Sequence, residues 1–164
     1  MPLLFHSFNA SSSEKSLGKP IIEGIPVGAV VDLIIENQLN DTIPLYKHGN
    51  PAWLLGAKDN ARFSYTDLEE AMAADENIGM SINFRDPALV TVHDLPPLGW
   101  SVLRFKLTAK AATMIHAVKL RYFALGMSAP IMEGILPNDP AEFPDSAVNR
   151  PHVDFEPKND GVFG

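Results

Sequence analysis

The sequence predicts an all-β fold, and three observations support this prediction. Short stretches rich in β-branched and other apolar residues recur along the chain, which is typical of strands. Turn-forming residues separate them, as in Gly49-Asn50-Pro51 and Pro96-Pro97-Leu98-Gly99. The length of 164 residues suits one domain with a single core. Together these features indicate a β-sandwich.

Composition sets the expected domain boundaries. Residues 1–20 are polar and rich in serine, and they are expected to form a flexible N-terminal arm. Residues 137–164 form a Pro-rich, mostly polar tail that is expected to wrap the surface or to be disordered. The ordered domain is therefore expected to span residues 21–136.

The first part of this domain is expected to contain three strands. Val30–Asn37 is apolar and β-branched, and Asp32 can face solvent, so this segment predicts a well-buried strand. Pro44–His48 and Ala52–Gly56 predict two further strands on either side of the first turn.

One short helix is expected between residues 65 and 74, because Thr66 is followed three residues later by Glu69, which forms a capping box with Thr66 as N-cap. Met114–Tyr122 has an ambiguous period, compatible with strand or helix. The remaining strands are expected at 90–92, 100–107 and 129–133.

Composition excludes several classes of function. The chain has 20 acidic and 13 scattered basic residues and a formal charge of −7, which argues against nucleic acid or a membrane surface as partner. It has no cysteine, so disulfides, thiolate metal sites and a cysteine nucleophile are excluded. It lacks a Gly-rich phosphate loop and a nucleophile elbow. The N-terminus has no signal-peptide pattern, so a cytoplasmic protein is expected.

Two segments carry the most functional information. Ile43–Asn50 reads Ile-Pro-Leu-Tyr-Lys-His-Gly-Asn, and its Tyr46 and His48 are two residues apart, so they share one face of a strand. Ile115–Tyr122 reads Ile-His-Ala-Val-Lys-Leu-Arg-Tyr and is followed by Gly126-Met127.

These two segments resemble the paired copper-binding signatures of the last cupredoxin domain of multicopper oxidases, the laccase family. Those signatures are His-Pro-x-His-x-His-Gly-x and His-Cys-His-x-x-x-His with a following Gly-Met. The resemblance runs in the family's order from about Val30 to Glu133 and includes four intervening segments, at 53–56, 63–65, 83–89 and 95–105. It implies a single cupredoxin-like Greek-key sandwich or barrel with one or two short helices, similar to the third domain of an ascomycete laccase.

The resemblance also implies that the blue-copper site is lost. Its three strong ligand positions are occupied by Ile43, Ala117 and Tyr122, and the axial position is kept as Met127. A lone thioether beside aliphatic side chains is not a ligand set for copper.

Two of the four positions that bind the trinuclear copper cluster keep a histidine. The four residues are Tyr46, His48, His116 and Val118. In the family the positions of His48 and His116 contribute to the same copper ion, so these side chains are expected within a few ångströms of each other.

The first functional hypothesis is a copper-independent enzyme of fungal secondary-metabolite biosynthesis, without a cofactor. His48, His116 and Tyr46 would act as an acid/base set in a cyclisation, isomerisation, dehydration or pericyclic step on a small apolar or aromatic intermediate. The substrate pocket would be lined by four residues, Trp53, Phe63, Tyr122 and Met127. A copper or zinc ion held by the two histidines, or by four in a dimer, is the metal alternative.

Two other hypotheses stay open. The chain is a homodimer or a non-catalytic partner of a separate oxidase, which predicts an apolar patch around the motif turns. Or it is a binding module that depends on its aromatic residues and tolerates loss of both histidines. The other histidines, His6, His93 and His152, are expected at the surface.

Overall fold

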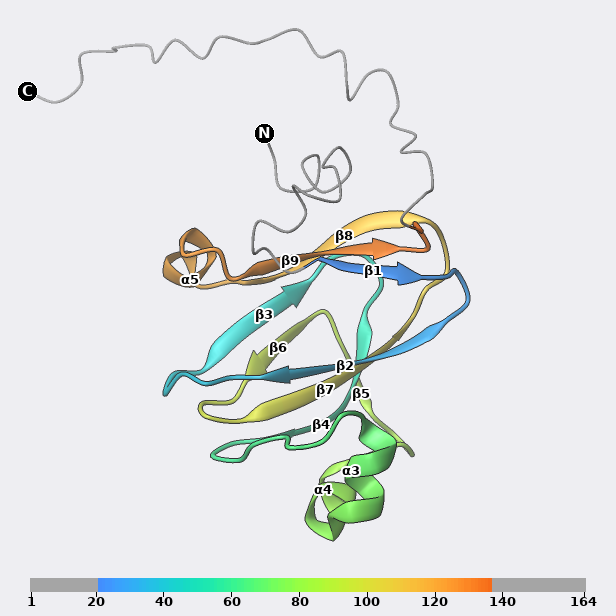
Figure 1. Cartoon of the computed structure of the whole chain (residues 1–164). Helices are drawn as coiled ribbons and strands as arrows, with labels where there is room; N and C mark the ends of the chain where they lie inside the picture. The colour runs from blue at the N-terminus through green and yellow to red at the C-terminus, as the bar shows by residue number, and fades with distance from the viewer. Residues whose placement is uncertain (1–20, 137–164) are drawn as a thin grey trace, which may run out of the picture.

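Two β-sheets pack face to face, with three short helices at their periphery, in the part of the chain that the computed structural model describes, residues 21–136 (Figure 1). The expected arm and tail lie outside these described residues. The strands are β1 (Ile22–Ile25), β2 (Val30–Glu36), β3 (Ile43–Lys47), β4 (Ala52–Lys58), β5 (Ala88–Val90), β6 (Val92–Leu95), β7 (Trp100–Lys106), β8 (Ala111–Ala117) and β9 (Ser128–Glu133). The helices are α3 (Leu68–Ala74), α4 (Glu76–Ser81) and α5 (Leu120–Ala124).

One sheet has five strands in the order β1-β9-β8-β3-β6, and the other has four in the order β2-β7-β4-β5. Neighbouring strands are antiparallel, except that β1 and β9 run parallel. The expected all-β sandwich is confirmed. However, residues 90–92 are not one strand, because the chain leaves β5 and enters β6 of the other sheet at Thr91.

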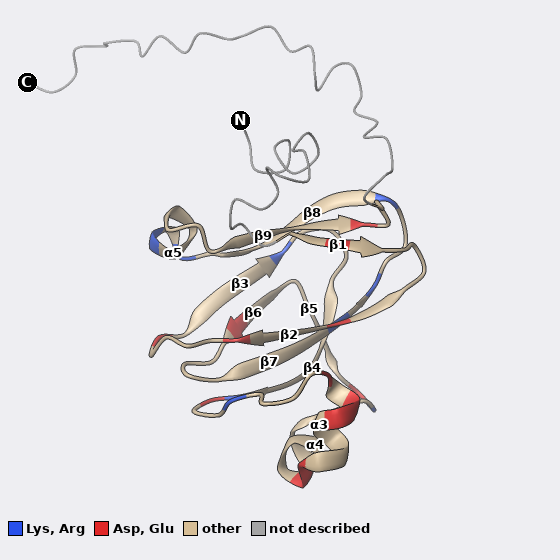
Figure 2. Ribbon diagram, viewed as in Figure 1, with Lys and Arg blue, Asp and Glu red and all other residues tan. Residues whose placement is uncertain are grey.

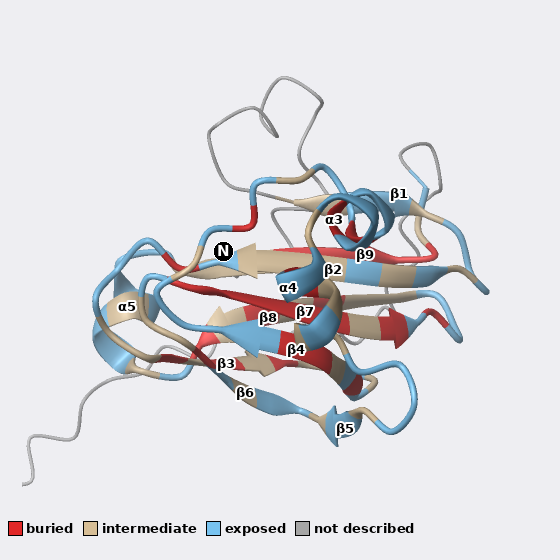
Figure 3. Ribbon diagram, turned by 90° about the horizontal axis from the view of Figure 1, so that it is seen from below, coloured by how far each residue is buried: buried red, intermediate tan, exposed pale blue. Residues whose placement is uncertain are grey.

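The alternation of side chains along β3 separates the core from the outer face of the five-stranded sheet. Ile43, Leu45 and Lys47 are buried, whereas Pro44 and Tyr46 are only half-buried. The same alternation along β8 buries Ile115 and Ala117 and leaves His116 half-buried. Buried segments of these strands lie in the interior of the sandwich (Figure 3).

Strand β7 is buried along most of its length because it contributes to two clusters. Leu103 and Phe105 belong to the core between the sheets. Trp100 and Val102 belong to a second cluster with Leu68 of α3 and with residues of α4. The two helices therefore cover one face of the four-stranded sheet, and the lower end of Figure 1 shows them there.

The helices differ from the expectation in number and in capping. The N-cap of α3 is Asp67, whose side chain accepts a hydrogen bond from the backbone N–H of Glu70. The Glu70 carboxylate in turn accepts from the backbone N–H of Thr66, so the capping box is displaced by one residue from the predicted pair of Thr66 and Glu69. Asp75 caps a second helix, α4. The segment Met114–Tyr122, whose period was ambiguous, forms the end of β8 and the start of a third helix, α5.

A buried ion pair joins the end of β3 to the end of β9. Lys47 and Glu133 have side chains exposed by only 2% and 3%, and Lys47 Nζ lies 3.1 Å from Glu133 Oε1. Lys47 also donates to the backbone carbonyls of His48 and Asn50, and Thr113 donates its hydroxyl to Glu133. The ammonium thus holds the turn that follows His48.

Candidate functional site

The retained histidines meet on the outer face of the five-stranded sheet. His116 on β8 lies opposite Tyr46 on β3, and His48 follows β3 directly. The backbone N–H of His48 donates to Met114 of β8, which continues the pairing of the two strands. The Nε2 atoms of His48 and His116 are 3.1 Å apart. The expected proximity of the two histidines is confirmed.

The backbone determines which nitrogen of each imidazole carries a hydrogen. Nδ1 of His116 lies 3.0 Å from the carbonyl oxygen of Ala117, which can only accept, so this nitrogen donates. In the neutral ring Nε2 of His116 is then an acceptor, and Nε2–H of His48 donates to it. His48 is oriented by His116, and His116 by the backbone.

Aromatic rings surround the histidine pair. The Tyr46 ring packs edge-on against His48 with centroids 4.4 Å apart, and its centroid is 5.8 Å from that of His116. The Phe123 ring of α5 packs edge-on against His116, with centroids 5.2 Å apart. Tyr46 lies on the same face as His48, as the spacing of two residues predicts. Phe123 was not predicted, because the period of Met114–Tyr122 did not reveal the helix that carries it.

The environment favours the neutral form of His48. Desolvation lowers the pKa of His48 below its usual value of 6.5, and the positive charges that His116 and Lys47 can carry lower it further. His48 is therefore an unprotonated imidazole at neutral pH, able to accept a proton.

The former blue-copper position has become part of the hydrophobic core. Ile43 and Ala117 are exposed by only 1% and 0%, and Tyr122 and Met127 pack against the same cluster. The Tyr122 hydroxyl donates to Asp41 at 2.7 Å. These side chains fill the space with methyl and methylene groups and do not fit a blue-copper ion.

Asp41 connects this region to α5. It accepts hydrogen bonds from Lys119, Arg121 and Tyr122, so the helix is held against the loop before β3. The hydrogen bond from Lys119 and, as a smaller cause, the hydrogen bond from Tyr122 hold the pKa of Asp41 well below its usual range. Tyr122, at the former ligand position, therefore has a hydrogen-bonding partner, Asp41, that was not predicted from the sequence.

A copper cluster does not fit the described residues alone. Two nitrogen ligands about 2.0–2.1 Å from one ion can be roughly 3 Å apart, so His48 and His116 could share one ion. Residues 21–136 nevertheless contain no group of three histidine, aspartate or glutamate side chains arranged to hold a metal. Val118, at the fourth cluster position, is exposed and offers no donor atom.

Two of the predicted pocket residues lie elsewhere. Trp53 is on β4 of the four-stranded sheet, where it pairs with Leu89 and Arg104 and is 40% exposed. Phe63 packs against Trp100 in the cluster under α3 and α4. The structure therefore does not bring Trp53 or Phe63 to the histidine pair. The sequence does not reveal which sheet each strand joins, so the predicted pocket combined residues that belong to different sheets.

His93 was expected at the surface, and this was wrong. It is half-buried on β6, and its Nε2 lies 2.7 Å from the hydroxyl of the fully buried Ser101 on β7. His6 and His152 are outside the described residues. Desolvation lowers the pKa of His93, so the folded protein holds this ring neutral.

The burial of His93 predicts a pH dependence of stability. Its folded-state pKa lies below the unfolded value of 6.5, so the unfolded state binds more protons in this range. The free energy of unfolding is therefore expected to fall as pH drops from about 6.5 through the lowered pKa, and His93→Gln should reduce that slope. Urea unfolding at pH 5 to 8 measures it. An unchanged slope in the variant would contradict the assignment. His48→Gln measures separately the contribution of the half-buried His48, whose pKa is also lowered.

Comparison with known proteins identifies the class and then the family. Two packed sheets in this order define a cupredoxin-like β-sandwich. The laccase from Botrytis aclada has the same fold, with a TM-score of 0.53 and 17% sequence identity. The match covers 79% of this chain and 22% of that laccase. A multicopper oxidase from Pediococcus acidilactici gives a TM-score of 0.52 at 16% identity over 79% of this chain and 24% of that one. The multicopper oxidase family model matches residues 5–135. The chain belongs to the multicopper oxidase family, which confirms the resemblance.

Several oxidases are more similar to the chain in sequence. A laccase of Pestalotiopsis fici is 31% identical over 137 residues, which are 79% of this chain and 22% of that protein. The L-ascorbate oxidase of Cucurbita pepo var. melopepo is 29% identical over 115 residues, 66% of this chain and 19% of that protein. Multicopper oxidase VdtB of Byssochlamys spectabilis is 28% identical over 103 residues, 60% of this chain and 14% of that protein. The chain thus spans between 14% and 22% of the length of these relatives.

The charge distribution adds one observation. Figure 2 shows lysine and arginine spread over several elements of the described part rather than gathered on one face. None of the described helices is long and apolar enough to span a membrane.

Proposed function

We propose that this chain is a copper-independent acid/base enzyme whose reactive group is the His48–His116 pair. The observation that carries the proposal is the 3.1 Å contact between the Nε2 atoms of two half-buried histidines that lie beside the rings of Tyr46 and Phe123. The blue-copper position is filled by Ile43 and Ala117, so the route by which a laccase takes up electrons has no ligands here.

Proton transfer would begin at His48. Because its Nε2–H is donated to His116, its other nitrogen, Nδ1, is the acceptor. Among residues 21–136 no hydrogen bond engages that atom. Nδ1 would take a proton from the substrate, and the resulting imidazolium would stay hydrogen-bonded to His116. His116 orients the base and shares its charge, and its bond to Ala117 fixes the tautomer.

Tyr46 supplies the second polar group of the proposed site. Its ring lies against both imidazoles, and a phenol can donate a hydrogen bond to oxygen that gains negative charge when the substrate loses its proton. Phe123 adds an apolar contact beside His116. The set suits a small apolar or aromatic intermediate and a non-oxidative step: cyclisation, isomerisation, dehydration or a pericyclic reaction.

We further place the proposed enzyme in fungal secondary-metabolite biosynthesis, in the cytoplasm and without a cofactor. Two of the similar proteins are fungal oxidases, the laccase of Pestalotiopsis fici and VdtB of Byssochlamys spectabilis.

A neutral aromatic probe tests the acid/base proposal without the natural substrate. 5-Nitrobenzisoxazole opens to a coloured phenolate when a base removes its C–H proton. His48→Ala is expected to lower the observed rate by about 10²–10⁴-fold, in the range of general base catalysis. The rate should increase with pH below about 6.5 and level off above, because only neutral His48 accepts a proton.

Three controls make this test specific. His93→Gln changes a histidine on another strand pair and should leave the rate unchanged. Tyr46→Phe should lower the rate less than His48→Ala does. Dialysis against EDTA, with elemental analysis of the protein before and after, should also leave the rate unchanged. Retention of the full rate by His48→Ala would disprove the proposal, and loss of the rate with EDTA would favour a metal at the pair.

A second candidate function, a partner subunit, is favoured by the surface next to the site. Leu120 and Leu125 on and beside α5 are exposed by 77% and 83%, and Val118 and Phe123 are also exposed. These exposed apolar side chains lie at and after the second motif and support the partner hypothesis, because apolar surface patches mark association surfaces. A homodimer or a complex with another pathway protein would cover it.

Sedimentation velocity tests whether the patch associates with a second copy. If it does, the wild type should sediment as a dimer at micromolar concentration, and the double variant Leu120→Asp/Leu125→Asp should sediment as a monomer. Met80→Asp, which changes an exposed methionine on α4, is the matched control and should not alter the dimer. A wild type that stays monomeric over a hundredfold range of concentration would exclude the homodimer.

A further inference from the structure

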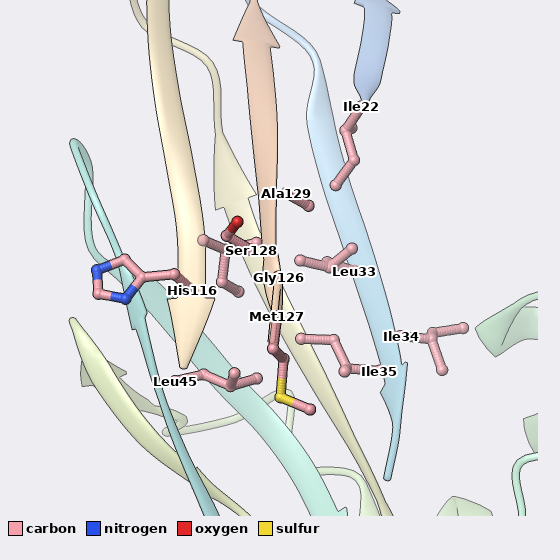
Figure 4. A pocket seen from close by; sticks show the side chains of 11 residues that line it. Ile22, Leu33, Ile34, Ile35, Leu45, His116, Gly126, Met127, Ser128 and Ala129 are labelled. Carbon is pink, nitrogen blue, oxygen red and sulfur yellow. The ribbon is translucent and has the colours of Figure 1, made fainter. Parts of the chain in front are cut away.

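A groove opens along the side of the sandwich where the two sheets meet (Figure 4). Three consecutive residues of β2 line one wall, Leu33, Ile34 and Ile35. Because neighbouring residues of a strand point to opposite faces, three in a row mean that the groove follows the strand edge. Met127 and Ala129 form part of the opposite wall, and Ile22 of β1 lies at one end.

The groove has the size and surface of a small-molecule site. Its volume is about 330 Å³, within the roughly 300–1,000 Å³ typical of ligand pockets. Most of its lining is aliphatic, and no lysine, arginine, aspartate or glutamate of the described chain lines it. Ser128 and His116 are the lining residues that have polar side chains. A ligand without formal charge is therefore favoured, since a charged one would lose its hydration without gaining a partner.

Pro130 of β9 makes the groove less suited to an added β-strand than to a small molecule. Strand β1 pairs with β9 only from Ile131 onward, so Ser128, Ala129 and Pro130 extend beyond the end of β1. Pro130 has no N–H, so this part of β9 cannot supply a full set of donors to a further strand. The groove is therefore suited to a ligand that binds by apolar contact and not by a hydrogen-bonded ladder.

We propose that this groove binds a neutral, apolar small molecule, such as a hydrocarbon chain or a fused-ring compound. The site is separate from the histidine pair, because the His116 imidazole points away from the groove (Figure 4). The ligand is held between the β2 edge and the start of β9, with the flexible Met127 thioether adapting to its shape. This binding does not depend on the acid/base function.

A fluorescent probe and a filled-groove variant test the proposal. N-Phenyl-1-naphthylamine, a neutral apolar dye, is expected to bind the full chain saturably at one site. Ala129→Phe places a ring in the groove and should weaken binding at least tenfold. Ala88→Phe, the same change on an exposed residue of β5, should leave binding unchanged. Circular dichroism and the unfolding midpoint report whether each variant is folded.

Methyl NMR of the wild type maps the dye independently of the variants. Dye-induced shifts concentrated on the methyl groups of Ile22, Leu33, Ile35 and Ala129 support the site. Shifts centred on α5 or on the Trp53 face, equal loss of binding in both Phe variants, or no saturable binding would overturn it. If sedimentation shows that the dye dissociates a dimer and that Ala129→Phe prevents the dimer, the groove is an interface between copies, and the proposal is also overturned.

Discussion

Lys47→Met is expected to lower the free energy of unfolding by about 3–5 kcal/mol, the range found when one partner of a buried ion pair is removed. The substitution leaves the Glu133 carboxylate buried without its cation, 3% exposed and with a hydrogen bond from Thr113. It also removes two donors from the carbonyls of His48 and Asn50. Urea unfolding monitored by tryptophan fluorescence measures the change.

The double variant Lys47→Met/Glu133→Leu separates the pair from its individual charges. Replacing both partners by apolar side chains removes the uncompensated charge, so most of the lost stability should return. Arg104→Met, which breaks the partly exposed ion pair with Asp32, is the matched control and should cost at most about 1 kcal/mol. A loss below 1 kcal/mol for Lys47→Met would show that the buried pair is not a main source of stability.

The same variant bears on the geometry of the histidine pair. Lys47 holds the His48 carbonyl from inside the sandwich, while the His48 side chain points to the outer face. If the double variant regains stability but still loses activity toward the benzisoxazole probe, Lys47 positions His48. Equal recovery of stability and activity would assign it a structural role only.

The sequence predicts much of the fold because strand residues alternate. β2, β3, β7 and β9 lie within about two residues of the expected segments. Two differences have identifiable causes. Thr66 and Asp67 are both good N-caps, so the pattern alone could not choose between them. Likewise Thr91 is an ordinary strand residue, and the change of sheet that occurs there depends on packing between sheets, which no local pattern reports.

The candidate site was predictable only where spacing or the family resemblance joined residues. Tyr46 and His48 share a face because they are two apart, and the resemblance implied that His116 lies beside them. Phe123 and Asp41 were missed because their contacts depend on how α5 docks. Trp53 was misplaced because an aromatic residue near a motif in sequence can belong to the opposite sheet.

Ile43→His, which restores a histidine at a former blue-copper position, is expected to destabilise the fold by about 3–6 kcal/mol. Losing a fully buried isoleucine accounts for about 2–3 kcal/mol, and burying an imidazole without a partner adds about 1–3 kcal/mol. Ile43 is 1% exposed and packs in the main core cluster, so the ring could not reach water without disrupting that cluster. Thermal unfolding and urea unfolding both measure the loss.

The pH dependence of this variant identifies the cause of the loss. A buried imidazole has a lowered pKa, so the variant should lose further stability relative to wild type as pH falls below about 6.5. Leu39→His changes an exposed leucine in the same way and should cost less than about 0.5 kcal/mol. If Ile43→His is as stable as wild type and gains copper by elemental analysis, the former site still accommodates a metal. Destabilisation without copper would instead show that hydrophobic packing has replaced the ligands, leaving His48 and His116 as the remaining chemically active part of the two motifs.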